Sequence, residues 1–330
     1  MINRRLFLGT LAQANFFCAG LARADSDIFT GKAITYIVAT KAGGGYDSMG
    51  RLVAKYLQKH LTGSTVVVKN VPGAGHLVGA ETIYSSPPDG LTIGTFNTGL
   101  LYSEITGRLE GKIALEKMSW IGKAASESRV VMVAANSDLK SVEDFKNPAR
   151  QIKIGASGKG SAGHFDTTIL ARTLGWNIKM IFGFEGTEGE MSLLRGEIDA
   201  VIGSRSSFEN YVGSGQGRFI LEIGGKRGSD VPQFESLATT AEAKSAVAII
   251  IAQAHFSRVT VGPPGIPADR LAILREAYMA ALADPELIAE AEKMDLPIDA
   301  ASGEAVAGRI RDALAVSPEI LAMMKEVMDE

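Results

Sequence analysis

The sequence predicts an α/β protein of two lobes, each a mostly parallel sheet flanked by helices. Three observations indicate this fold. The chain has 330 residues, more than a typical single domain contains. Strand-like and helix-like segments alternate over residues 34–96 and again over 151–203, an order that favours parallel sheets. Each series contains one glycine-rich run between a strand and a helix, at residues 43–47 and 158–163.

The first 24 residues have the pattern of an export signal. Two arginines at residues 4–5 precede an apolar stretch over 6–22, and Ala-Arg-Ala at 22–24 is a small-x-small cleavage pattern. Polar residues interrupt the stretch, whereas a membrane span needs about 20 apolar residues. We therefore expect cleavage near Ala24 and a periplasmic protein. The arginine pair leaves both the general and the twin-arginine export routes open.

Composition excludes several kinds of site and partner. The only cysteine, Cys18, lies within the export signal, so the exported chain has no disulfide and no thiolate metal site. The formal net charge of −3 becomes more negative once the signal is removed, because the charged residues of the signal are all arginines. This balance indicates no nucleic-acid partner. The four histidines are scattered without metal-binding spacing, so we expect no metal site.

The first series of elements has βαβαβ order. Strands are expected at 34–40, 66–68 and 91–96, and helices at 48–61 and 77–85. Apolar residues of the first helix recur at helical spacing, and Asp47 or Ser48 is placed to cap its N-terminus. A parallel sheet with helices on its faces follows from this order.

The same order restarts in the second half of the chain. Strands are expected at 151–156, 178–184 and 198–203, and helices at 164–174 and 188–194. Glu188 and Glu190 have the pattern of an exposed helix start, where acidic residues are favoured. We therefore expect a second sheet of similar construction.

Two segments are expected to join the lobes as crossing strands, near residues 120–132 and 246–262. Helical patterns near 285–293, 303–315 and 317–328 are expected to cover the lobes. The expected division is a signal peptide at 1–24, lobe 1 at 25–124 with 255–330, and lobe 2 at 125–254.

Both glycine-rich runs have the features of an anion site. A helix start presents unpaired N–H groups and a partial positive charge, and glycines let a ligand approach the backbone. Residues 158–163 also match GxGxxG, with Glu185 at the end of the next strand. Three interpretations of this run therefore stay open, namely a dinucleotide site, a site for a small anion and a purely structural turn. For residues 43–47, the alternatives are a ligand loop and a tight turn capped by Asp47.

Polar residues follow three further strands at their carboxyl ends, where ligands bind in open parallel sheets. They are Asn97 and Thr98, Gly186 and Thr187, and Ser204 and Arg205. Arg205 and Lys41 each suit either a ligand carboxylate or a surface ion pair. His164 suits either helix capping and packing or ligand contact. The chain has no GxSxG elbow or other catalytic constellation, so we expect no enzyme.

Taken together, these residues resemble the periplasmic solute receptors of tripartite tricarboxylate transporters, also called the Bug family. The similar segments are residues 42–47, 66–75, 88–90, 157–161 with His164, 196–199, 231–234 and 263–267. The sequence departs from the commonest family pattern at Lys41, at His76 and at residues 257–259. The resemblance implies a receptor that traps a small organic carboxylate between its lobes and delivers it to integral membrane permease subunits. We expect a monomer without a cofactor.

The resemblance also implies that backbone N–H groups and waters at the two glycine loops hold the ligand carboxylate. With the strand-end residues and His164 added, the expected ligand-binding residues are Lys41, Gly44, Gly45, Tyr46, Asp47, Asn97, Thr98, Ser157, Gly160, Ser161, His164, Gly186, Thr187, Ser204 and Arg205. Two other functions stay open. One is an exported dinucleotide-dependent oxidoreductase with its cofactor at residues 158–163, and the other is a ligand-sensing receptor for a membrane kinase.

Overall fold

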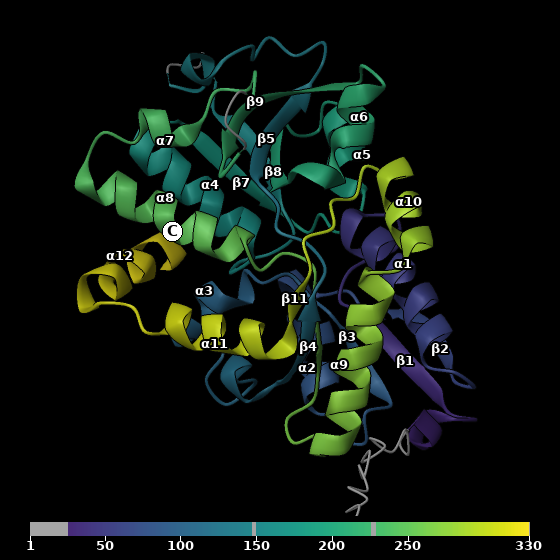
Figure 1. The fold of residues 1–330 in the computed structure, drawn as a ribbon. Coiled ribbons are helices and arrows are strands. Elements are labelled where there is room, and N and C mark those ends of the chain that lie inside the picture. The colour runs from purple at the N-terminus through teal and green to yellow at the C-terminus, as the bar shows by residue number, and fades with distance from the viewer. Residues whose placement is uncertain (1–25, 147–149, 226–228, 330) are drawn as a thin grey trace, which may run out of the picture.

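The computed structural model describes residues 26–146, 150–225 and 229–329. Two sheets with flanking helices form two lobes, which confirms the predicted α/β fold (Figure 1). We call the part built on the six-stranded sheet lobe 1 and the part built on the five-stranded sheet lobe 2. The expected signal peptide, residues 1–24, lies outside the described residues.

The sheet of lobe 1 has the strand order β11-β4-β10-β3-β1-β2. Its strands are β1 (Ala33–Val38), β2 (Thr65–Asn70), β3 (Thr92–Thr95), β4 (Ser119–Lys123), β10 (Val259–Gly262) and β11 (Ala301–Ser302). As predicted, β1 pairs in parallel with β2 and β3. Strand β10 pairs antiparallel with β3 and β4, and β11 pairs antiparallel with β4. The chain leaves lobe 1 after β4 and returns to it before β10, so these two strands run in opposite directions.

The sheet of lobe 2 has the order β7-β6-β8-β5-β9. Its strands are β5 (Arg129–Ala134), β6 (Ile152–Ala156), β7 (Ile178–Phe182), β8 (Ala200–Ser204) and β9 (Gly217–Ile223). Strand β6 pairs in parallel with β7 and β8, as expected, and β5 runs antiparallel between β8 and β9. Each sheet thus combines parallel with antiparallel pairs, so the expectation of mostly parallel sheets is wrong, although the α/β architecture is as predicted.

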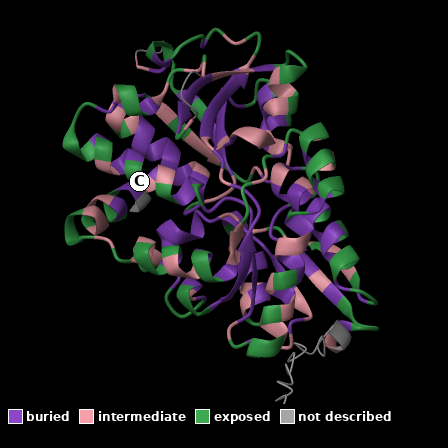
Figure 2. Cartoon of the chain, in the orientation of Figure 1, coloured by how far each residue is buried: buried purple, intermediate pink, exposed green. Residues whose placement is uncertain are grey.

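Helices cover the faces of both sheets. In lobe 1 they are α1 (Gly45–His60), α2 (Leu77–Tyr84), α3 (Leu100–Ile105), α9 (Ala268–Leu282), α10 (Pro285–Lys293) and α11 (Gly303–Leu314). In lobe 2 they are α4 (Ala162–Leu174), α5 (Glu188–Leu194), α6 (Glu209–Gly213), α7 (Phe234–Leu237) and α8 (Ala241–Ala254). Buried residues concentrate on the strands that these helices cover (Figure 2).

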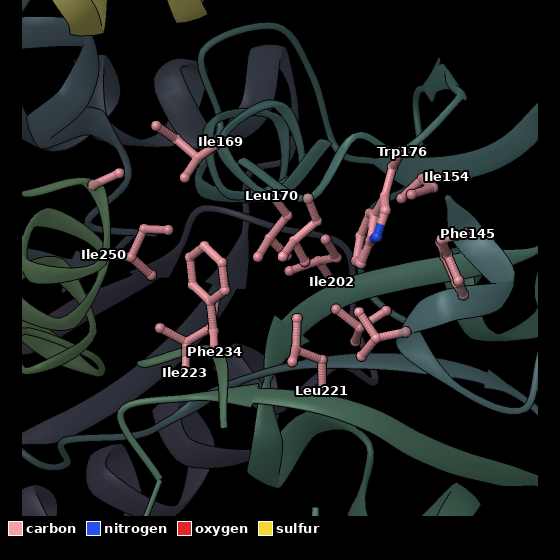
Figure 3. Packing of buried hydrophobic residues seen from close by; sticks show 14 of the residues in the cluster. Phe145, Ile154, Ile169, Leu170, Trp176, Ile202, Leu221, Ile223, Phe234 and Ile250 are labelled. Carbon is pink, nitrogen blue, oxygen red and sulfur yellow. The ribbon is translucent and has the colours of Figure 1, made fainter. Parts of the chain in front are cut away.

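The C-terminal helix covers lobe 2, although we expected it in lobe 1. Helix α12 (Pro318–Asp329) packs on α4, and its residues Met324 and Val327 are fully buried in the core of lobe 2. Figure 3 shows part of this core, in which the rings of Phe145 and Trp176 lie 4.6 Å apart. Because α11 packs on β4 of lobe 1, the chain crosses between the lobes once more after α11.

The prediction of a second crossing strand is wrong over residues 246–254, because these residues belong to α8. Thr240 caps this helix, and its buried residues, among them Ala243, Val247 and Ile250, recur at helical spacing. A short apolar run does not by itself distinguish a buried helix from a strand. The crossing is therefore made by the four residues between α8 and β10.

Helix α4 begins with a side-chain cap inside the second glycine run. The Ser161 hydroxyl accepts a hydrogen bond from the His164 N–H at 3.3 Å, and Nδ1 of His164 accepts one from the Gly160 N–H at 3.2 Å. Ser161 is 2% exposed and His164 fully buried. The two side chains thus hold the turn that starts α4.

We expect Ser161→Ala to lower the free energy of unfolding by about 1 kcal/mol, because an N-cap hydroxyl satisfies a backbone N–H that alanine leaves unpaired. Chemical denaturation measures the change. Ser161→Gly is the matched control, since glycine at an N-cap costs only a few tenths of a kcal/mol. Equal stability of Ser161→Ala and the unmodified chain would contradict the capping role.

Candidate ligand-binding cleft

A cavity of about 120 Å³ lies between the lobes, at the N-termini of α1 and α4. This is smaller than the roughly 300–1,000 Å³ of pockets for drug-sized ligands, so it suits a small molecule. Of the residues expected to bind a ligand, those on its wall are Gly44, Gly45, Tyr46, Asn97, Ser157, Gly186 and Ser204. The wall therefore takes residues from both lobes.

The other expected residues do not line the cavity. They are Lys41, Asp47, Thr98, Gly160, Ser161, His164, Thr187 and Arg205. Arg205 forms ion pairs with Glu209 at 2.6 Å and Glu222 at 3.1 Å, and the buried Thr98 hydroxyl accepts a hydrogen bond from Gln253 at 2.7 Å. These side chains are engaged within the protein.

Backbone N–H groups at two helix N-termini lie on the cavity wall. Helix α1 begins at Gly45 with Gly44 as its N-cap, three residues before the expected Ser48, so Asp47 falls within the first turn rather than capping it. The N–H groups of Gly45 and Tyr46, and that of Gly163 in α4, have no acceptor in the part of the chain that is described. Such groups are free to donate to an anion.

Arg129 brings a buried positive charge to the wall, together with its own counter-charge. Its Nε donates to Asp166 at 2.7 Å, and its Nη1 lies 3.4 Å from the Ser204 hydroxyl. Burial raises the pKa of the Asp166 carboxyl, while Arg129 acts to lower it. The pair adds little net charge to the cavity, and no pattern in the sequence pointed to it.

His76 stands on the wall in a left-handed conformation, with φ +79°. Histidine adopts this region more readily than most residues other than glycine. Burial, together with the positive charge of Arg258, lowers the pKa of His76 to about 4, so its ring is neutral at neutral pH. The ring lies 5.4 Å from that of Tyr46. The departure from the family pattern at His76 therefore falls at the cavity.

Glu190 is buried on the cavity wall, which corrects our expectation of an exposed helix start. It is 4% exposed, whereas the Glu188 side chain is 44% exposed and pairs with Lys41 at 2.6 Å. Residues two apart on a helix point to different sides, so α5 turns one carboxyl outward and the other inward. Burial raises the pKa of Glu190 to about 7.

Glu185 joins the lobes through a backbone contact. Its two carboxylate oxygens accept the N–H of Gly73 at 3.2 and 3.1 Å, although Gly73 belongs to lobe 1 and Glu185 to lobe 2. Burial raises the pKa of this carboxyl, against the lowering effect of the Gly73 N–H. A lobe 2 carboxylate thus already uses a backbone donor of lobe 1.

Further contacts close the lobes around the cavity. The Gly186 N–H donates to the Thr40 hydroxyl at 3.2 Å, and the Ser103 hydroxyl donates to the Gly160 carbonyl at 3.1 Å. A Cβ atom added at Gly44 would stand 3.0 Å from the Gly186 Cα. Glycine therefore lets the two backbones approach this closely.

A buried ion pair lies where the two crossing segments meet. Glu127 follows β4 and Arg258 precedes β10, and the Arg258 Nε lies 2.7 Å from a Glu127 carboxylate oxygen. The guanidinium also donates to the hydroxyls of Ser206 and Ser207 in lobe 2 and lies over the Tyr46 ring of lobe 1 at 4.2 Å. One side chain thus contacts both lobes and both crossings.

A second cavity, of about 740 Å³, has Glu127 of this ion pair on its wall. Its described walls carry Glu209, Glu222, Glu292 and Asp295, with Arg205 paired to two of the carboxylates. The described part of this wall therefore carries more carboxylates than cations. Among the described residues, no cluster of histidine, cysteine or carboxylate side chains is placed to hold a metal ion, and no helix is long and apolar enough to cross a membrane.

Comparison with known proteins identifies relatives over most of the chain. A protein of Bordetella pertussis from the group called UPF0065 is 25% identical over 277 residues, covering 80% of this chain and 81% of the relative. Protein BugT of the same organism is 26% identical over 236 residues, covering 67% of this chain and 69% of BugT.

Solved structures share the fold. The periplasmic binding protein BugD has a TM-score of 0.75 at 21% identity, over 90% of this chain and 97% of BugD. MatC from Rhodopseudomonas palustris with bound malate has a TM-score of 0.71 at 17% identity, over 90% of this chain and 99% of MatC. An R. palustris protein with adipate has a TM-score of 0.72 at 19% identity, over 89% and 97% of the two chains. The family model of the tripartite tricarboxylate transporter family receptor matches residues 49–325, and the chain belongs to this family.

Proposed function

We propose that this chain is a periplasmic solute receptor that binds a small organic carboxylate in the cavity between its lobes. It would deliver the ligand to the integral membrane permease subunits of a tripartite transporter and carry out no catalysis. One observation carries the proposal, namely that the first turns of α1 and α4, from different lobes, both contribute to the wall of one cavity. Family membership supports the receptor role, and the malate and adipate bound to similar structures support the ligand class.

The mechanism follows from the placement of the backbone donors. A carboxylate between the lobes would accept hydrogen bonds from Gly45 and Tyr46 on one side and Gly163 on the other, together with further wall residues such as Ser157. It would make all of these contacts only when the lobes are closed, so binding shifts the population toward the closed form. Opening the lobes would remove half of the contacts and release the ligand to the permease.

A dinucleotide at residues 158–163 is less well supported. The Gly160 N–H, which a phosphate would need, already donates to His164, and a cavity of about 120 Å³ is small for two nucleotides. The sensory alternative uses the same cavity and differs only in its membrane partner, which co-purification would identify.

Isothermal titration of ligand-stripped protein should give binding heat with malate or adipate and none with NAD. Both dicarboxylates are small anions, whereas the dinucleotide is larger than the cavity. A panel of other di- and tricarboxylates extends the test to ligands of different length. Absence of heat from every carboxylate would overturn the proposal, and heat from NAD would favour the oxidoreductase.

Gly44→Ala should weaken carboxylate binding about tenfold, equivalent to about 1.4 kcal/mol, by holding the lobes apart. The added methyl would meet the Gly186 backbone at 3.0–3.1 Å, and backbone atoms cannot rotate away. Gly213→Ala is the matched control, because its added Cβ has nothing within 4 Å. Titration measures affinity and denaturation confirms folding. Equal affinity of the two variants would show that lobe contact at Gly44 does not limit binding.

A further inference from the structure

Glu190 is a carboxyl group within a cavity that we expect to receive a carboxylate. It lies on α5, which packs against β8 and β5, and the wall of the same cavity also carries Phe184, Val201 and Phe208. In the described chain it forms no ion pair with a lysine, arginine or histidine. A buried carboxylate without a cation is costly, so the neutral form is favoured at this position.

The charged and titratable groups around the cavity leave Glu190 without a counter-charge. On β5, Arg129 is paired with Asp166. On α6, burial raises the pKa of Tyr211, and the negative charge of Glu190 adds a smaller rise. From the turn before α5, Glu185 is bonded to Gly73. From lobe 1, the wall carries the neutral ring of His76 and the buried phenol of Tyr46.

We propose that Glu190 binds the ligand as a neutral carboxylic acid, hydrogen-bonding through its O–H to a ligand carboxylate, so that binding takes up a proton wherever Glu190 is ionised in the free receptor. The inference rests on the proposed function. Two ionised carboxylates in one cavity repel each other, and such pairs commonly share a proton. A protonated glutamate has one O–H donor, which adds to the backbone donors at the helix N-termini.

The pH dependence follows by linkage. The free Glu190 has a pKa of about 7, and a bound anion raises that pKa further. Below about pH 6 the group is already protonated, so binding takes up no proton and the affinity is constant. The uptake is about half a proton at pH 7 and approaches one proton by about pH 8, above which the affinity falls roughly tenfold per pH unit. The pKa of His76, about 4, places its titration outside this range.

The test is calorimetric titration with malate from pH 6 to pH 9, in pairs of buffers that differ in ionisation enthalpy. The difference in heat between paired buffers gives the number of protons taken up. For the unmodified chain we expect uptake to rise from near zero at pH 6 to near one at pH 8.5. Uptake near zero throughout, with binding intact, would overturn this inference and leave the receptor proposal standing. Absence of binding at every pH would overturn both.

Glu190→Gln assigns the proton. Glutamine retains a donor of similar size but does not titrate, so binding should lose its proton uptake and become independent of pH. Glu188→Gln, on the exposed side of the same helix, should keep the uptake of the unmodified chain. Uptake that persists in Glu190→Gln and disappears in Glu185→Gln would assign the proton to Glu185 and overturn the inference. If Glu190→Gln does not fold, absence of uptake in the unmodified chain still overturns the inference, and loss of uptake in Glu185→Gln does so as well.

Discussion

The buried ion pair between Arg258 and Glu127 is the interaction on which the arrangement of the two lobes depends. Both side chains are 1% exposed, and removing such charges from water costs several kcal/mol for each ion. The cost is offset only while the two crossing segments stay together and the guanidinium keeps its contacts with Ser206, Ser207 and the Tyr46 ring. The same contacts fix the first turn of α1 against lobe 2, and that turn forms one wall of the cavity.

Close approach of the lobes is the second constraint, and glycine makes it possible. A Cβ at Gly44 would meet the Gly186 backbone, and one at Gly158 would stand 3.0 Å from the Gly75 backbone N. Anion binding accounts for glycines beside a ligand, but these glycines also face the backbone of the opposite lobe. The glycine-rich runs thus serve lobe closure as well as the exposure of backbone donors.

Hydrophobic patterning predicted the local elements of the fold, because α1 buries apolar residues at helical spacing and strands such as β1 and β8 are short, largely buried apolar runs. It could not predict that residues 246–254 continue a helix, since an apolar run fits either element when its partners are unknown. The cavity wall was predictable where it follows strand ends and glycine turns, as at Gly45 and Ser204. Arg129 and Glu190 were missed because their roles depend on which neighbours the tertiary fold brings to them.

The balance of charges in the cavity argues for a receptor that binds and releases. Asp166 cancels Arg129, His76 is neutral, and Glu185 is already satisfied by the Gly73 N–H. Under the proposed function, the attraction for an anion would therefore come from backbone dipoles contributed by two separate lobes rather than from a fixed cation in one of them. Since neither lobe alone offers the full set of donors, the proposed ligand would lose the donors of one lobe as soon as the cleft opens.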